Sequence, residues 1–192
     1  RYGTQPANSF EDGSEVSAAT TLISWSMAKS IAHAAVGVLV GDGVLDPDAP
    51  AAVPEWRGTD KEAIRMIDLL EMRSGLRFVE DYVDGSVSDC LEMLYGPASD
   101  DMAAYAAGLP LDHRPGEVWN YSSGTTNIVS RIIGDVVHGD PVGTPAGRRA
   151  AMEGFLHERL FGPLGMATAT AKFDTAGTWV GSSYVYATAH DF

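Results

Sequence analysis

Near the start of the chain stands the run Ser24-Trp25-Ser26-Met27-Ala28-Lys29-Ser30. It opens a segment, residues 26–40, in which apolar residues recur every three or four positions, so the sequence predicts a helix there. The apolar positions of that predicted helix are Met27, Ile31, Ala34, Ala35 and Val38. Ser26 and Lys29 are three residues apart and are therefore expected one turn apart on the same helix face.

This pair could perform nucleophilic chemistry. The unpaired N–H groups at a helix start favour an anion, as an alkoxide or oxyanion requires. A serine becomes a strong nucleophile when a base is adjacent, and Lys29 is placed to be that base. The other interpretation is an N-cap serine followed by a solvated lysine.

A second candidate lies in the turn Pro115-Gly116-Glu117-Val118-Trp119-Asn120-Tyr121-Ser122-Ser123-Gly124. A tyrosine in such a turn can point its hydroxyl into a cleft and exchange protons with a serine or a leaving group. The alternative is a packed aromatic ring with N-cap serines behind it.

The remaining elements suggest an α+β fold with more helix than strand. Thr59 and Glu62 form a possible capping box for a helix that Gly75 would end. Further helices are predicted over residues 88–95, 100–107, 123–138 and 144–161, strands over 18–25 and 180–186, and a helix start at Thr188. No stretch is apolar over the roughly 20 residues that a transmembrane helix needs.

Composition excludes several classes of function. The 192 residues carry 13 Lys+Arg against 26 Asp+Glu, a net charge of −13. Such a chain repels nucleic-acid phosphates and anionic lipid, so we expect neither nucleic acid nor membrane as a partner. One cysteine, Cys90, excludes a disulfide framework and is expected to be a buried thiol. The five histidines lack metal-ligand spacing, so no metal site is expected.

Together, the motifs resemble those of the serine β-lactamase and penicillin-binding-protein superfamily, and most of all its class C-like branch. That branch includes class C β-lactamases, carboxylesterases, D-aminopeptidases and 6-aminohexanoate-oligomer hydrolases. The resemblance covers nearly the whole chain, in order and spacing. Besides the two runs quoted above, it rests on Pro54-Glu55-Trp56, Leu69-Leu70-Glu71-Met72-Arg73-Ser74-Gly75-Leu76 and Leu160-Phe161-Gly162-Pro163-Leu164-Gly165-Met166.

The resemblance implies roles for individual residues. Ser26 would be the acylated nucleophile, with its own backbone N–H as one oxyanion donor, and Lys29 would help to deprotonate it. Tyr121 would be the second general acid–base of a Tyr-x-Asn element in which Ser123 stands at the Asn position and would contact substrate. This departure argues against β-lactam turnover. No metal or organic cofactor is implied.

The resemblance also implies missing parts. The family's Lys-Thr-Gly or His-x-Gly strand has no counterpart after Tyr121. We therefore expect residues 1–192 to be one β-lactamase-related domain, incomplete at both ends, that is mainly helical because most of the sheet is missing. An apolar face left uncovered in this way could form a homodimer.

The sequence gives only the general class of the substrate and leaves the cellular location open. A small-molecule amide or ester is expected, and both a cytoplasmic and a periplasmic or secreted bacterial location fit. Glu80-Asp81-Tyr82 with Asp84 resembles the aminohexanoate-hydrolase group, so Tyr82 and Asp84 could contact substrate; the alternative is a solvated acidic loop. Two other functions stay open: a non-catalytic or ligand-binding member of the fold, and a penicillin-binding D,D-peptidase.

Overall fold

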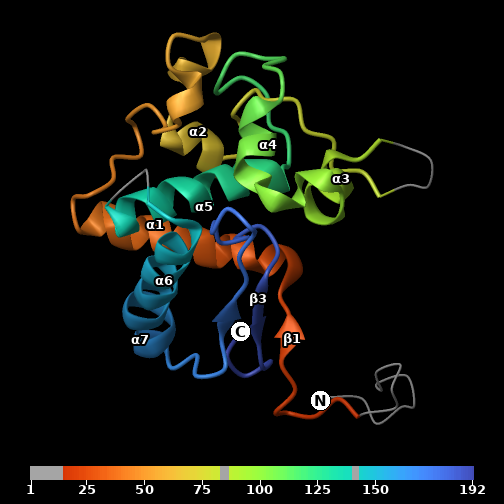
Figure 1. Cartoon of the computed structure of the whole chain (residues 1–192), viewed down its shortest axis with the longest axis vertical. Coiled ribbons are helices and arrows are strands. Elements are labelled where there is room, and N and C mark those ends of the chain that lie inside the picture. The colour runs from red at the N-terminus through yellow and green to blue at the C-terminus, as the bar shows by residue number, and fades with distance from the viewer. Residues whose placement is uncertain (1–14, 83–86, 140–142) are drawn as a thin grey trace.

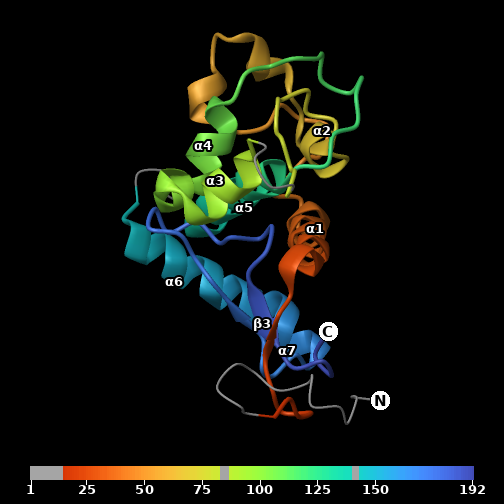
Figure 2. The same cartoon turned by 90° about the vertical axis from the view of Figure 1, so that its right-hand side faces the viewer.

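Two helices, α1 (Ala28–Gly41) and α5 (Ser123–His138), lie across the middle of the molecule (Figure 1). The computed structural model describes residues 15–82, 87–139 and 143–192. The helices α2 (Met66–Leu70), α3 (Asp89–Tyr95) and α4 (Met102–Gly108) lie on one side of the central pair; α6 (Pro145–Leu156), α7 (Gly162–Leu164) and the sheet lie on the other (Figure 2). No helix in these ranges is long and apolar enough to cross a membrane.

Shorter helical turns join these elements. Four are 3₁₀ turns: Trp25–Met27, Pro54–Trp56, Asp60–Ala63 and Pro97–Asp100. A π turn, His157–Phe161, continues α6 toward α7, so the helix predicted over 144–161 is confirmed with a change of pitch.

The sheet has three short antiparallel strands in the order β1-β3-β2. These are β1 (Leu22–Ile23), β2 (Thr170–Ala171) and β3 (Val185–Ala187). Leu22 lies opposite Ala187, and Thr170 lies opposite Tyr186. The sheet joins residues near both ends of the chain, and the predicted α+β class is confirmed.

Helix α5 is the centre of the core and packs against α1, α2, α4 and α6. Its residues are buried from Ser123 to Ile133. The Ser122 side chain caps its start by accepting from the Thr125 N–H, and Gly139, at φ +73°, ends it. The first turn of α5 is thereby fixed in the interior beside α1.

Helix α1 buries a stripe that shares only Ala35 with the apolar positions predicted from the sequence. Its buried apolar residues are Ala28, Ala32, Ala35, Val36 and Leu39, and Lys29 is buried with them. Met27 is 55% exposed, Ala34 is exposed, and Ile31 and Val38 are half-buried. Both stripes have helical spacing, so periodicity shows that a helix forms but does not show which side faces α5.

The helix predicted after Thr59 is wrong as a single element. Thr59 caps only the 3₁₀ turn Asp60–Ala63, and the Glu62 carboxylate accepts from the Gly58 N–H instead of closing a capping box. The chain is extended at Arg65, and α2 begins after it with the Asp68 carboxylate accepting from the Arg65 N–H. Gly75 lies beyond α2, in a turn at φ +79°.

Two C-terminal predictions also need correction. Residues 181–183 form a turn instead of the predicted strand, and β3 begins only at Val185. The Asn127 side chain holds that turn by accepting from the Ser182 N–H at 3.2 Å. Thr188 starts no helix; its carbonyl accepts from the Asp191 N–H in a turn.

Candidate active site

Ser26 and Lys29 lie together at the start of α1. The Lys29 Nζ is 3.1 Å from the Ser26 Oγ. Ser26 is exposed, whereas Lys29 is only 7% exposed. The predicted one-turn separation thus gives an accessible hydroxyl with an amine directly behind it.

Two further oxygen atoms surround the Lys29 amine. Its Nζ donates to the Ser123 Oγ at 3.0 Å and to the Ser182 carbonyl at 3.0 Å. Both acceptors are buried. Lys29 is therefore held by groups from the start of α5 and from the turn before β3, far away in the sequence.

Tyr121 lies beside this amine through its ring. The Nζ of Lys29 is 4.8 Å from the Tyr121 ring centroid, a cation–π distance. The Trp119 ring lies 6.4 Å from that of Tyr121 and is exposed. The structure therefore brings Ser26, Lys29, Tyr121 and Ser123 to one place.

Ser123 is linked to the loop before α3. Its backbone N–H donates to the Glu80 Oε2 at 2.6 Å, and its Oγ donates to the Glu80 Oε1 at 2.7 Å. The Tyr82 hydroxyl donates to the same Glu80 Oε1 at 2.9 Å, although Tyr82 is 62% exposed. Tyr82 thus lies near the site, while Asp84 is outside the described residues.

Cys90 contacts this loop through Tyr82. It is fully buried, as expected, and its Sγ is 3.4 Å from the Tyr82 hydroxyl. Burial raises the pKa of the Cys90 thiol, and burial together with the Cys90 and Glu80 contacts raises the pKa of Tyr82. Both groups therefore stay protonated at neutral pH, so neither adds negative charge to the site.

The backbone before the nucleophile is anchored and bent. The Ser24 Oγ donates to the Ser183 carbonyl at 3.0 Å and accepts from the Val185 N–H at 3.1 Å. Trp25 then takes φ +46°, unusual for a residue with a side chain. This bend between an anchored serine and α1 presents Ser26 at the surface.

Sequence reasoning missed three residues of this arrangement. Glu80 was noted only as part of a motif, and Ser182 and Asn127 were not noted. A backbone carbonyl such as that of Ser182 leaves no compositional signal. Asn127 is one of several buried polar residues of α5, together with Thr125, Thr126, Ser130 and Arg131, so its residue type alone did not single it out.

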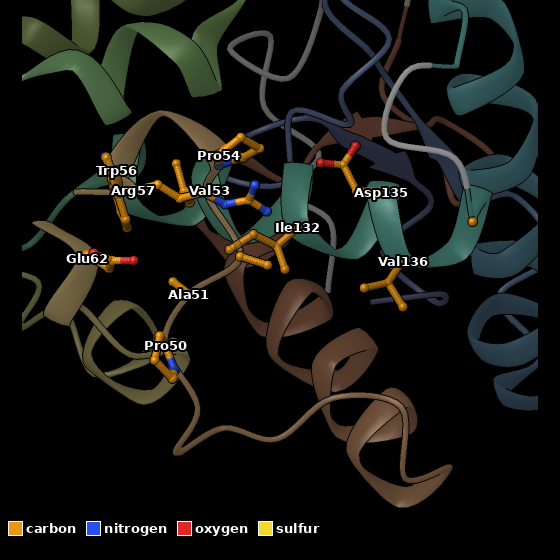
Figure 3. A pocket seen from close by; sticks show the side chains of 12 residues that line it. Pro50, Ala51, Val53, Pro54, Trp56, Arg57, Glu62, Ile132, Asp135 and Val136 are labelled. Carbon is orange, nitrogen blue, oxygen red and sulfur yellow. The ribbon is translucent and has the colours of Figure 1, made fainter. Parts of the chain in front are cut away.

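A separate hollow of about 490 Å³ lies between the segment 50–57 and the C-terminal half of α5 (Figure 3). Most of the side chains that line it are apolar, and the charged residues Asp135, Glu62 and Arg57 also line it. None of the predicted site residues lines it. Within the described ranges, no group of three or more His, Cys, Asp or Glu could hold a metal ion.

Solved structures share this fold. A candidate 6-aminohexanoate-dimer hydrolase from Bacillus anthracis matches with a TM-score of 0.72 and 16% identity, over 91% of this chain and 46% of that one. The D-alanine carboxypeptidase AmpC from Burkholderia cenocepacia matches with 0.64 and 17%, over 96% and 51%. A D-amino acid amidase from Ochrobactrum anthropi SV3, in complex with L-phenylalanine, matches with 0.62 and 19%, over 95% and 55%.

The chain spans about half the length of these structures. Among curated proteins, none matches the sequence. The Beta-lactamase family model matches residues 2–191, almost the entire sequence. The chain therefore belongs to the β-lactamase family, within the superfamily of serine β-lactamases and penicillin-binding proteins.

Proposed function

We propose that this chain carries the nucleophile and proton relay of a serine hydrolase that cleaves a small amide or ester through an acyl-serine intermediate. One observation carries the proposal: the exposed Ser26 hydroxyl lies 3.1 Å from the buried amine of Lys29. Membership in the β-lactamase family supports it, as do structural neighbours that include an amidase.

The proposed reaction uses these residues in a fixed order. Ser26 Oγ attacks the substrate carbonyl carbon while its proton passes to the neutral amine of Lys29. The backbone N–H of Ser26 stabilises the oxyanion. The proton then reaches the leaving amine or alkoxide through Tyr121, and the bond to the leaving group breaks. Water attacks the acyl ester in the same way and releases the acid and free Ser26.

Covalent labelling tests the proposal. A fluorophosphonate loses fluoride when a primed serine attacks its phosphorus, so intact mass after incubation reports a phosphonyl adduct. We expect one adduct on the wild-type chain and none on Ser26→Ala. Ser30→Ala is the matched control, because Ser30 is an exposed serine one turn further along α1, and it should label like wild type.

The outcomes separate the possible functions. An adduct that survives in Ser26→Ala would show that the assigned nucleophile is wrong. No adduct on the wild-type chain would overturn hydrolysis by this chain and favour a ligand-binding member of the fold. Stable acylation of Ser26 by penicillin would favour a D,D-peptidase over a general amide or ester hydrolase.

A further inference from the structure

A continuous row of hydrogen bonds runs from the nucleophile to a carboxylate that our sequence analysis assigned no role. Ser26, Lys29, Ser123 and Glu80 follow one another, with heavy-atom distances of 3.1, 3.0 and 2.7 Å. Ser123 is 1% exposed, so no bulk water competes for its hydroxyl. The direction of each bond in this row can therefore be worked out from the chemistry of its atoms.

The carboxylate end fixes the direction. An ionised carboxylate only accepts hydrogen bonds. The two oxygens of Glu80 accept from the two donors of Ser123, with the backbone N–H on Oε2 and the hydroxyl on Oε1. The single hydroxyl proton of Ser123 is thereby committed to Glu80, and the oxygen of that hydroxyl presents lone pairs to Lys29.

At Lys29, the other end of the row, these bond directions leave only one way for the amine to meet Ser26. The Ser182 carbonyl can only accept, and Ser123 Oγ must accept because its proton is on Glu80. In the neutral form that the proposed function requires, the Lys29 amine has two N–H bonds and one lone pair. Both N–H bonds are used on Ser182 and Ser123, so the lone pair is left for the third neighbour, the Ser26 hydroxyl.

We propose that Glu80 is a positioning residue that aims the lone pair of Lys29 at Ser26 by fixing the direction of the Ser123 hydroxyl. This inference rests on the proposed function of Ser26 and Lys29 and adds a residue to it. Without the carboxylate, the Ser123 hydroxyl can turn toward Lys29 and claim the lone pair. Tyr82, which donates to Glu80 Oε1 at 2.9 Å, helps to hold the carboxylate in place.

Glutamine at position 80 changes the hydrogen-bond direction at Ser123 while it keeps the size and shape of the side chain. Gln has the same size but one accepting oxygen and one donating nitrogen, whereas both donors of Ser123 need acceptors. Glu80→Gln must therefore give up the backbone bond or reverse the hydroxyl. Glu92→Gln is the matched control, because Glu92 is exposed on α3 and takes no part in the row.

The first experiment is a double-mutant cycle on the fluorophosphonate labelling rate. Misaligning a catalytic group costs up to about 100-fold, so we expect Glu80→Gln to label about 10- to 100-fold more slowly across the pH range while the chain remains folded. Ser123→Ala should label slowly as well. In the Ser123→Ala background, Glu80→Gln should change the rate by less than about 2-fold, because the hydroxyl through which it acts is gone. Equal slowing in both backgrounds, or unchanged labelling in Glu80→Gln, overturns the inference while leaving the proposed function intact.

A second measurement needs no reactivity. The chain has three lysines, Lys29, Lys61 and Lys172, so the ε-methylene signals of ¹³C-labelled lysine are easily resolved by NMR. We expect Glu80→Gln to move the Lys29 signal, and Ser123→Ala to abolish most of that move, with the other two lysines as internal references. A Lys29 signal that stays in place, or that moves equally in both backgrounds, overturns the inference even if the chain does not label.

Discussion

A single glycine closes the turn that leads toward the site loop. Gly75 has φ +79°, and a Cβ added there would lie 2.1 Å from the backbone carbonyl oxygen of His113. Its own carbonyl accepts from the Asp112 and His113 N–H groups, so the neighbouring segment cannot easily move away. We expect Gly75→Ala to lower the free energy of unfolding by at least about 2 kcal/mol in urea titrations.

The chain offers a matched glycine for comparison. Gly37 is exposed in α1, and an added Cβ would meet nothing within 4 Å. Gly37→Ala should therefore stabilise the protein by about 0.5–1 kcal/mol through helix propensity. Equal effects of the two substitutions would show that the turn at Gly75 is not rigid.

At the scale of elements, Asp174 joins the segment between β2 and β3 to α4. One carboxylate oxygen accepts from the Met102 N–H at the start of α4, and the other accepts from the Thr178 N–H. Burial raises the pKa of Asp174 from 3.8 to about 6. The folded state thus holds this proton more tightly than the unfolded state, so the contribution of Asp174 to stability grows as the pH falls through 6 toward 4 and is lost at pH 7.

This pH dependence of stability can be measured by comparing the wild-type protein with Asp174→Asn. Relative to Asp174→Asn, which does not titrate, the wild-type protein should gain up to about 3 kcal/mol of unfolding free energy between pH 7 and pH 4. Urea titrations of both chains across that range measure the gain. Parallel pH dependences would mean that the Asp174 carboxyl titrates normally.

The elements also show what sequence could and could not predict. The α5 helix was predictable at both ends, because the Ser122 cap and Gly139 are local signals. The turn at 181–183 was not predictable, because apolar and polar residues alternate over 180–186 as they do in a strand. The turn is instead held by the side chain of Asn127 from α5. The Ser26–Lys29 pair followed from helical spacing, whereas Glu80 reaches Ser123 only through the fold.

At the scale of the molecule, apolar side chains are exposed around the start of α1 and at α7. Met27, in the 3₁₀ turn before α1, and Ile31 of α1 line a hollow with Leu164 and Phe192, and Leu164 is 68% exposed. We expect the chain to dimerise through this face at high concentration, since contiguous apolar patches favour association. Sedimentation velocity should show weaker dimers for Leu164→Lys but not for Leu91→Lys, a similarly apolar residue exposed on α3. A wild-type chain that stays monomeric at high concentration would contradict this expectation.

Under the proposed function, the turn at 181–183 has a consequence for when Ser26 becomes reactive during synthesis. Ser26 and Lys29 leave the ribosome before Ser182, whose carbonyl holds the Lys29 amine and which is added more than a hundred and fifty residues later. The order of translation therefore leaves the proposed nucleophile without this contact to its base until Ser182 has been made. The appearance of a reactive serine would then report the moment at which the turn at 181–183 docks beside Lys29.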